Sequence, residues 1–460
     1  MESSIVFIKD AKEATSWYLV EDQVLFGEIS QVQLNEKSYL LVGIKQEQFT
    51  EDIIRHLAGN IRKKLNKNVF NRVYIDFHQL FNSISNLSTD RILLLFFEGW
   101  FLSGYQFAKF KSKKPQQNIE LVFDQKFNHH AETALRRAES VCVARDLCNE
   151  PANQLTPDLY ANKLEELFEG SKVNVSFIKG KDLTDRGFHA TQKVGKGSIN
   201  KPIVALLSLQ NGSQRHISLV GKGVTFDSGG TNTKQASNIV DMKMDMGGSA
   251  AVVGAMKLLN DLDVNVNVTT IIPIVTNVSG GKAYLPSDVI QYANGLTVEV
   301  GNTDAEGRLI LADGLLYAQS IGADTIIDIA TLTGTIGQAL GLKYAGLFCN
   351  KMEDFGVYHK IGEQSGDPVW PMPLEKDYQM YLESETADIS NVGSCKFGGA
   401  IIAAQFLSNF IDNHKKWIHI DMANTVKAYK LSGYYTAGAT GFGVRLIVDL
   451  IQKEVEQYVY

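Results

Sequence analysis

Two kinds of hydrophobic pattern alternate along most of the chain. Short apolar runs typical of strands occur at residues 203–209, 217–220, 264–275, 296–300, 325–329 and 417–421. Segments with helical spacing lie between and after them, at 249–262, 309–321, 400–413 and 443–456. This alternation predicts an α/β domain with a mixed, mostly parallel sheet flanked by helices. In such sheets the chemistry usually lies in loops at the carboxyl ends of the strands.

The beginning of the chain shows the same pattern on a smaller scale. Apolar runs at 39–44, 73–77 and 119–123 accompany a helical stretch at 51–65, which predicts a small α/β domain over residues 1–128. It has no dense cluster of acids, His or Cys, so we expect it to serve assembly or access. Residues 131–146 have helical spacing, with Leu135, Ala138, Val141 and Ala144 recurring every third position, before Pro151. We therefore predict a linker helix over 129–148 and a larger α/β domain over 149–460.

Composition narrows the class of protein. The chain has 460 residues, 44 % of them hydrophobic, and a formal net charge of −6, which is ordinary for a globular protein and argues against nucleic acid as a partner. Charged residues between Glu2 and Glu13 interrupt any signal-peptide core, and no window approaches 18 uncharged apolar residues. We expect a cytoplasmic protein with no membrane association. The four cysteines form no CxxC pair and are expected to be reduced structural thiols.

Two glycine-rich segments carry charged residues that could perform chemistry. Residues 220–230, VGKGVTFDSGG, follow a predicted strand and place Lys222 and Asp227 in a loop. The phosphate-loop pattern GxxxxGK[ST] is absent there, and the alternative is a turn with a surface lysine. Residues 241–248, DMKMDMGG, put Asp245 before a predicted helix, where it could also be a simple N-cap.

A third segment, NTDAEGRL at residues 302–309, contains two acids and an arginine. If the chain is extended there, Asp304 and Glu306 point to the same side. Two carboxylates held together repel each other unless a cation lies between them, so a metal ion is the natural partner. The alternative is an acidic loop neutralised by its own Arg308.

Taken together, the three segments predict a metal site. Asp227, Asp245, Asp304 and Glu306 all follow predicted strands and can meet at one rim of the sheet, and four carboxylates imply more than one divalent ion. Paired metals can bind a nucleophilic water and polarise a carbonyl. The ligands are oxygens, with one nitrogen from Lys222 as a neutral amine, which suits Mg²⁺, Mn²⁺ or Zn²⁺ and makes loading pH-dependent. The patterns GxSxG and HExxH are absent, and His419 alternates with apolar residues as a core histidine does.

At these motifs the chain resembles the leucyl aminopeptidase (cytosol aminopeptidase) family of two-metal exopeptidases. The resemblance rests on residues 302–309, 220–230 and 243–248, with support from 146–153 and 438–443, and it covers roughly residues 140–450. It implies a catalytic domain over 149–460, two divalent ions per subunit, short peptide substrates and a homohexamer. A free metal position would bind the substrate α-amino group and restrict cleavage to the N-terminal residue.

The resemblance also implies roles for individual residues. Asp227 and Glu306 would bridge the metals, Lys222 and Asp245 would complete the tighter site, and Asp304 the exchangeable one. Lys234 would polarise the scissile carbonyl, and Arg308 would hold a bicarbonate ion as general base. The pocket for the first side chain, expected to be Leu or another apolar residue, would be lined by Met242, Thr331, Leu332 and Gly334.

The chain departs from the family pattern at three places, and two other functions remain open. Residues 230–234 are more polar than usual, Leu285 lies where the family often has Arg, and Asn424 replaces a usual Gly. A two-metal phosphate-ester hydrolase is favoured by little besides Lys234 and Arg308. A binding protein acting through residues 1–128 is the other alternative, although the near-balanced charge of that region argues against nucleic acid.

Overall fold

A computed structural model of the chain describes residues 2–10, 13, 17, 27–44, 49–66, 70–113, 119–212 and 215–456. The chain forms two compact units, Met1–Glu139 with Lys430–Gly438, and Ser140–Tyr429 with Ala439–Tyr460. Helix α5 (Asn128–Asn149) carries the chain from the first unit into the second. The functional division expected at residues 128 and 148 stays a prediction.

The first unit is built on a five-stranded sheet with strand order β2-β3-β1-β4-β5, in which only β2 and β3 pair antiparallel. Its elements are β1 (Glu2–Ile8), β2 (Ile29–Leu34), β3 (Lys37–Gly43), α2 (Glu51–Asn66), β4 (Arg72–Ile75), α3 (Phe77–Phe81), α4 (Thr89–Ser103), β5 (Glu120–Val122) and η2 (Gln125–Phe127). A late segment of the chain, Lys430–Gly438, also belongs to this unit. In it the Tyr434 hydroxyl donates a hydrogen bond to Asp52 of α2 at 2.8 Å.

The second unit contains a nine-stranded sheet with strand order β15-β14-β17-β13-β8-β10-β7-β6. Strand β9 is not in this order: it follows β8 in the chain and pairs with the later part of β10, whose earlier part pairs with β8. The pairs that β8, β9, β10, β13 and β17 form with one another are parallel, whereas β10 pairs with β7 and β17 with β14 antiparallel, so the predicted mixed, mostly parallel sheet is confirmed. The strands are β6 (Asn174–Lys179), β7 (Ile203–Gln210), β8 (His216–Gly221), β9 (Gly223–Gly230), β10 (Asn267–Val278), β13 (Thr325–Ala330), β14 (Ala345–Cys349), β15 (Val369–Pro371) and β17 (Lys416–Asp421).

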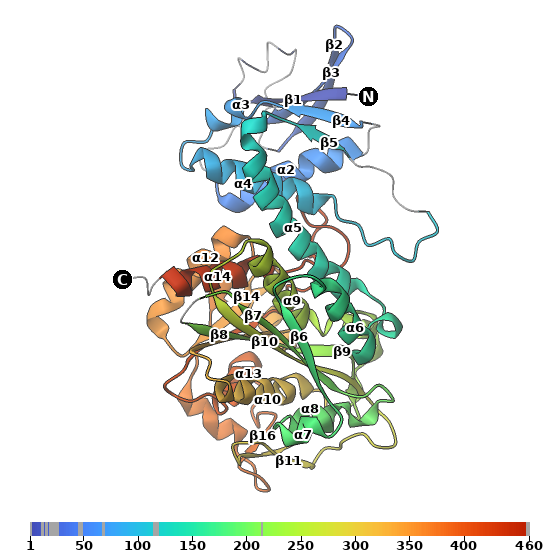
Figure 1. Cartoon of the computed structure of the whole chain (residues 1–460), viewed down its shortest axis with the longest axis vertical. Helices are drawn as coiled ribbons and strands as arrows, with labels where there is room; N and C mark the ends of the chain where they lie inside the picture. The colour runs from blue at the N-terminus through green and yellow to red at the C-terminus, as the bar shows by residue number, and fades with distance from the viewer. Residues whose placement is uncertain are drawn as a thin grey trace. The chain divides into compact units, whose positions relative to one another are not determined.

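Helices cover both faces of this sheet (Figure 1). One face carries α9 (Gly247–Asp261), α12 (Phe355–Ser365) and α14 (Val444–Glu456), and the other carries α8 (His189–Val194), α10 (Glu306–Ser320) and α13 (Gly399–Ser408). The remaining elements are α6 (Pro157–Phe168), α7 (Asp182–Asp185), α11 (Gly334–Leu340), η3 (Ala152–Gln154), η4 (Gly195–Gly197), η5 (Ala236–Met244), η6 (Met352–Asp354), η7 (Lys376–Leu382), and a small sheet of β11 (Val289–Gln291), β12 (Thr297–Glu299) and β16 (Ile389–Ser390). Among the described residues, none of the helices combines the length and apolar character that crossing a bilayer requires.

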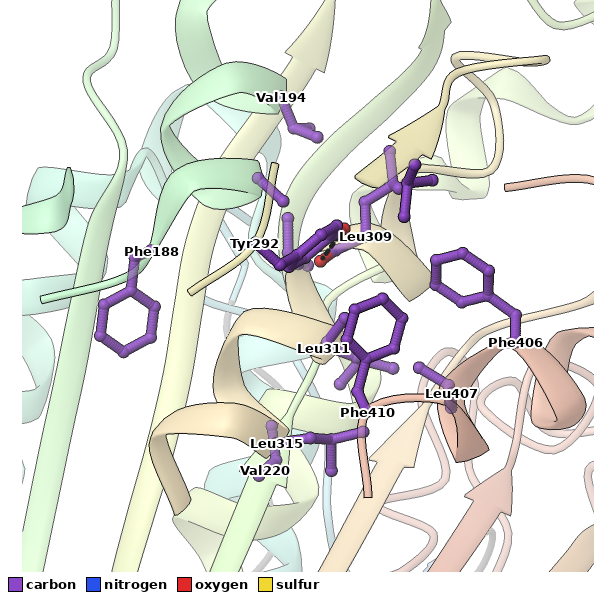
Figure 2. Close-up of a cluster of buried hydrophobic side chains, with 14 of the residues drawn as sticks. Phe188, Val194, Val220, Tyr292, Leu309, Leu311, Leu315, Phe406, Leu407 and Phe410 are labelled. Carbon is purple, nitrogen blue, oxygen red and sulfur yellow. Dashed lines mark hydrogen bonds between the residues drawn. The ribbon is translucent and has the colours of Figure 1, made fainter. Parts of the chain in front are cut away.

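The core around α10 fixes the start of that helix. Leu309, Leu311 and Leu315 of α10 point into a cluster of buried apolar side chains (Figure 2). Within it, the rings of Tyr292 and Phe410 lie 4.6 Å apart, and the Tyr292 hydroxyl donates to the Leu309 carbonyl at 3.1 Å. This packing holds the first turn of α10, where Glu306 is the first residue.

Two local predictions are wrong. The segment predicted as a glycine-rich loop at 220–230 is largely strand β9, because its small residues let it press against β10. A Cβ on Gly223 would lie 2.5 Å from the Pro273 carbonyl oxygen. The chain is not extended at Glu306, which begins a helix after Ala305 at φ −110° and ψ 38°. The same-side argument for Asp304 and Glu306 therefore does not apply.

Candidate active site

Four segments deliver the predicted residues to one side of the sheet. Lys222 lies between β8 and β9, and Asp227 lies within β9. Asp245 follows η5 directly, and Glu306 begins α10. Asp245 is not the N-cap of α9, since that position is Met246 and it makes no side-chain cap hydrogen bond.

Three of the four predicted carboxylates form one compact group. Asp227, Asp245 and Glu306 each offer an oxygen, and these oxygens all lie within 4.8 Å of one another. Asp304 lies next to the group, because its carboxylate and that of Asp227 both pair with Lys234. The structure therefore brings together four acids that the sequence placed in three separate motifs.

Two lysines lie among these acids. Lys222 Nζ is 2.8 Å from Asp245 and 2.9 Å from Glu306, and it donates to the Thr331 carbonyl at 2.8 Å. Lys234 Nζ is 2.8 Å from Asp227. Lys222 is almost completely buried, whereas the Lys234 side chain is 23 % exposed and faces the cavity. Both lysines line the cavity, and Lys234 is the more exposed of the two.

Burial dominates the electrostatics of the site. Burial, reinforced by repulsion from Asp227, raises the pKa of Glu306 to about 8, and burial raises the pKa of Asp245 to about 6. Burial alone would lower the pKa of Lys222, but attraction to Asp245 and Glu306 outweighs it and raises that pKa. Carboxylates held this close in a low-dielectric site favour the binding of further positive charge.

This donor set fits divalent metal ions. The buried acids supply oxygen ligands at short mutual distances, and Lys222 adds one nitrogen within reach of two of them. Oxygen-rich sites of this kind suit Mg²⁺ and Mn²⁺, and Zn²⁺ also accepts carboxylates.

Asn277 is a functional candidate that sequence reasoning missed. Its Nδ2 donates to Asp227 Oδ1 at 2.8 Å, to the Thr303 carbonyl at 2.9 Å and to Glu306 Oε2 at 3.4 Å. It is fully buried in β10, in register with Asp227 of β9. A lone Asn in an apolar strand gives no signal of this role, because the contact depends on pairing across 50 positions of sequence.

Asn391 organises the loop before Glu306. Its Oδ1 accepts from the N–H groups of Gly301 and Asn302 at 2.8 and 3.2 Å, and its carbonyl accepts from Arg308 at 2.8 Å. Arg308 is described in full and does not line the cavity. Its guanidinium is largely buried, which lowers its pKa to about 10, and its Nε has no hydrogen-bond partner among the described residues.

The unusually polar segment before Lys234 has a structural role. The Asn232 N–H donates to Thr303 Oγ1 at 2.9 Å, and the Thr303 N–H donates back to Asn232 Oδ1 at 2.9 Å. This reciprocal pair fastens the loop that carries Lys234 to the loop that carries Asp304. Leu285, another departure from the family pattern, is exposed and does not line the cavity.

One cavity of about 630 Å³ joins these residues. Every predicted site residue except Arg308 lines it, namely Lys222, Asp227, Lys234, Met242, Asp245, Asp304, Glu306, Thr331, Leu332 and Gly334. Apolar residues from later in the chain complete the lining, including Leu342, Ala423 and Val426.

His419 lies elsewhere, fully buried with its Nδ1 2.6 Å from Asp328, which confirms it as a core histidine. The four cysteines, all within the described residues, form no disulfide bond there.

Comparison with known proteins identifies the family. The model of the cytosol aminopeptidase family, catalytic domain, matches residues 142–448. The chain is 36 % identical over 440 residues to a probable cytosol aminopeptidase of Rickettsia felis, a match that covers 93 % of this chain and 87 % of the relative. It is 38 % identical over 451 residues to one of Chlorobium phaeobacteroides, covering 94 % and 89 %. The chain belongs to the cytosol aminopeptidase family.

Solved structures support this assignment. The bottromycin maturation enzyme BotP superimposes with a TM-score of 0.90 at 28 % identity, covering 99 % of both chains, and a second structure of it, in complex with Mn, matches equally well. As a cytosol aminopeptidase family member, the protein is a peptidase of a metal-dependent class.

Proposed function

We propose that the protein is a two-metal leucyl aminopeptidase that removes an apolar N-terminal residue from short peptides in the cytoplasm and acts as a homohexamer. The observation that carries the chemistry is the group of buried oxygens from Asp227, Asp245 and Glu306 within 4.8 Å, open to a cavity that Lys234 also lines. The cellular location and the assembly rest on the family relationship.

Five residues would hold the metals: Lys222, Asp227, Asp245, Asp304 and Glu306. Bound Zn²⁺, Mn²⁺ or Mg²⁺ would supply a water of lowered pKa and polarise the scissile carbonyl. The chain's own part is to fix these ligands, and Asn277 does so by donating to both Asp227 and Glu306.

Lys234 would stabilise the oxyanion of the cleaved peptide bond. Burial opposes its charge, but attraction to Asp227 outweighs burial and raises its pKa, so it keeps its proton at neutral pH. A protonated amine at a partly exposed position of the cavity can donate a hydrogen bond to the oxygen as negative charge develops there.

Arg308 would hold bicarbonate, which would supply a general base. The unpartnered, buried Nε of Arg308 supports a small anion at this position. The first side chain of the peptide would enter between Met242, Thr331, Leu332 and Gly334, which line the same cavity as the carboxylates.

The test is hydrolysis of leucine p-nitroanilide after chelation and again after Mn²⁺, Zn²⁺ or Mg²⁺ is restored. We expect activity to disappear with chelator, to return with metal, and to be absent for the N-acetylated substrate. Glu306→Gln should abolish turnover, while Glu169→Gln on the surface should not. Full turnover by Glu306→Gln with its metal retained would overturn the proposal, as would hydrolysis of a phosphate monoester in place of the anilide.

A further inference from the structure

Asn424 makes hydrogen bonds that a glycine cannot make. It follows β17, at a position where the family usually has Gly. Its Nδ2 donates to the carbonyl of Gly341 and, at 2.8 Å, to the carbonyl of Tyr344. These two carbonyls flank Leu342, so one side-chain amide fastens both ends of the turn that presents Leu342.

The turn is fixed from its other sides as well. Gly341 follows the last residue of α11 at φ 71° and ψ −150°, a conformation that essentially only glycine adopts. The Tyr344 ring packs edge-on against Trp370, with centroids 6.0 Å apart. A Cβ on Gly337 of α11 would lie 3.0 Å from the Asn424 Cβ, so the helix lies directly against Asn424. Leu342 therefore has a defined position.

Leu342 presents apolar surface to the cavity. It is 58 % exposed although it lines the same cavity as the carboxylates, together with Ala423 and Val426. Covering exposed apolar surface is favourable, so this wall favours an apolar group. The two charged side chains that line the cavity outside the carboxylate and lysine cluster, Asp241 and Lys427, pair with each other at 2.8 Å and leave no unbalanced charge beside it.

We infer that Leu342 is a specificity determinant and Asn424 its positioning residue. Leu342 forms a wall that contacts long apolar first side chains, so the enzyme selects peptides that begin with Phe, Met or Leu over those that begin with Ala. This inference rests on the proposed function. It adds a contact outside the Met242, Thr331, Leu332 and Gly334 pocket.

The test compares kcat/KM for the p-nitroanilides of Ala, Leu, Met and Phe. In Leu342→Ala we expect the Phe-to-Ala ratio of kcat/KM to fall about tenfold, the effect of losing a few methylene contacts in an apolar pocket. Asn424→Gly introduces the residue usual in the family and removes both donors without adding a charge to the cavity, which Asn424 also lines, and we expect a similar fall in the ratio. Leu285→Ala is the matched control, because Leu285 is 54 % exposed and does not line the cavity.

A binding measurement separates this inference from the proposed function. The thermal shift given by L-phenylalanine in the presence of Mn²⁺ should exceed that given by L-alanine in the wild-type protein, and Leu342→Ala should remove the difference. If the wild type hydrolyses the anilides but both variants keep its Phe-to-Ala ratio, the inference is overturned. If no anilide is hydrolysed but the difference in thermal shift depends on Leu342, the proposed function is wrong. The inference that Leu342 contacts apolar side chains is then still supported. Should Asn424→Gly fail to fold, Leu342→Ala still decides the outcome.

Discussion

Asn277 shows how one uncharged side chain can organise a cluster of charges. Its single amide group donates to two carboxylates and to the backbone of the loop between them. Partners of this kind orient metal ligands, and their loss typically weakens metal binding while leaving the ligands themselves in place.

Replacing Asn277 with Ala should weaken metal binding by about 10- to 100-fold, because Asp227 and Glu306 lose the donor that orients them. Competition with a chelator for Mn²⁺ measures this directly. Asn350→Ala is a suitable control, since the Asn350 side chain bonds the Lys415 carbonyl and the Trp417 N–H in the described part of the chain, away from the acids. Equal Mn²⁺ affinity in both variants would contradict the role given to Asn277.

Helix α9 begins in close contact with the sheet. The Ser249 N–H donates to the Lys222 carbonyl at 2.9 Å, and a Cβ on Gly248 would lie only 2.0 Å from the Ile329 carbonyl oxygen of β13. The start of α9 therefore helps to position Lys222 and also Asp245, which lies two residues before the helix. Glycine is required at this close approach of two backbones.

Gly248→Ala should lower the free energy of unfolding by about 1–3 kcal/mol or more, because backbone atoms cannot move aside as a flexible side chain can. Gly356→Ala is the matched control. It is also the second residue of its helix, α12, but its Cβ would meet nothing within 4 Å. That change should instead stabilise the protein by about 0.5–1 kcal/mol. Urea unfolding of the two variants compares them, and equal effects would refute the packing argument.

The elements were predictable to the extent that their patterns are local. The helical spacing of apolar residues at 131–146 predicts α5. The apolar runs at 203–209 and 325–329 predict β7 and β13, and the predicted bounds lie within a few residues of the observed ones. Strand β9 was not predictable, because glycines in a sequence are typical of loops. Here they form a strand because β9 pairs with β10, and that contact is not visible in the local sequence. The carboxylates of the site could be found because they lie in three recognisable motifs, one of which holds both Asp304 and Glu306. Asn277 and Asn391 could not, because their roles depend on contacts made across long sequence separations.

At the scale of the whole molecule, a late segment of the chain stabilises an early unit. Asp52 of α2 accepts a hydrogen bond from Tyr434 and lies 3.5 Å from His56. Burial would raise the pKa of Asp52, but the hydrogen bond and charge of His56, the charge of Arg55 and the hydrogen bond from Tyr434 together outweigh burial and hold that pKa well below its usual range. The carboxylate is therefore stabilised in the folded protein.

Because the pKa of Asp52 is lowered on folding, its contribution to stability is present above about pH 4 and declines as the pH falls further. Asp52→Asn should lower the free energy of unfolding at pH 7 by about 1–3 kcal/mol. The difference from wild type should shrink as the pH falls below about 4. Urea unfolding across this pH range measures it. Asp90→Asn, in an Asp–His pair whose acid is 79 % exposed, should cost much less. A cost of Asp52→Asn that does not change with pH would contradict this account.

The lining of the cavity has a consequence for how this protein evolves. Every described residue that lines it belongs to the second unit. Substitutions in the first unit thus change no side chain of the cavity. Recombination that exchanged the chain before Ser140 would transmit all the acids and lysines of the cavity intact, but the incoming segment would have to keep contacts such as that of Asp52 with Tyr434. The ancestry of the chemistry and the ancestry of the N-terminal unit are therefore separable questions, to be traced with separate phylogenies.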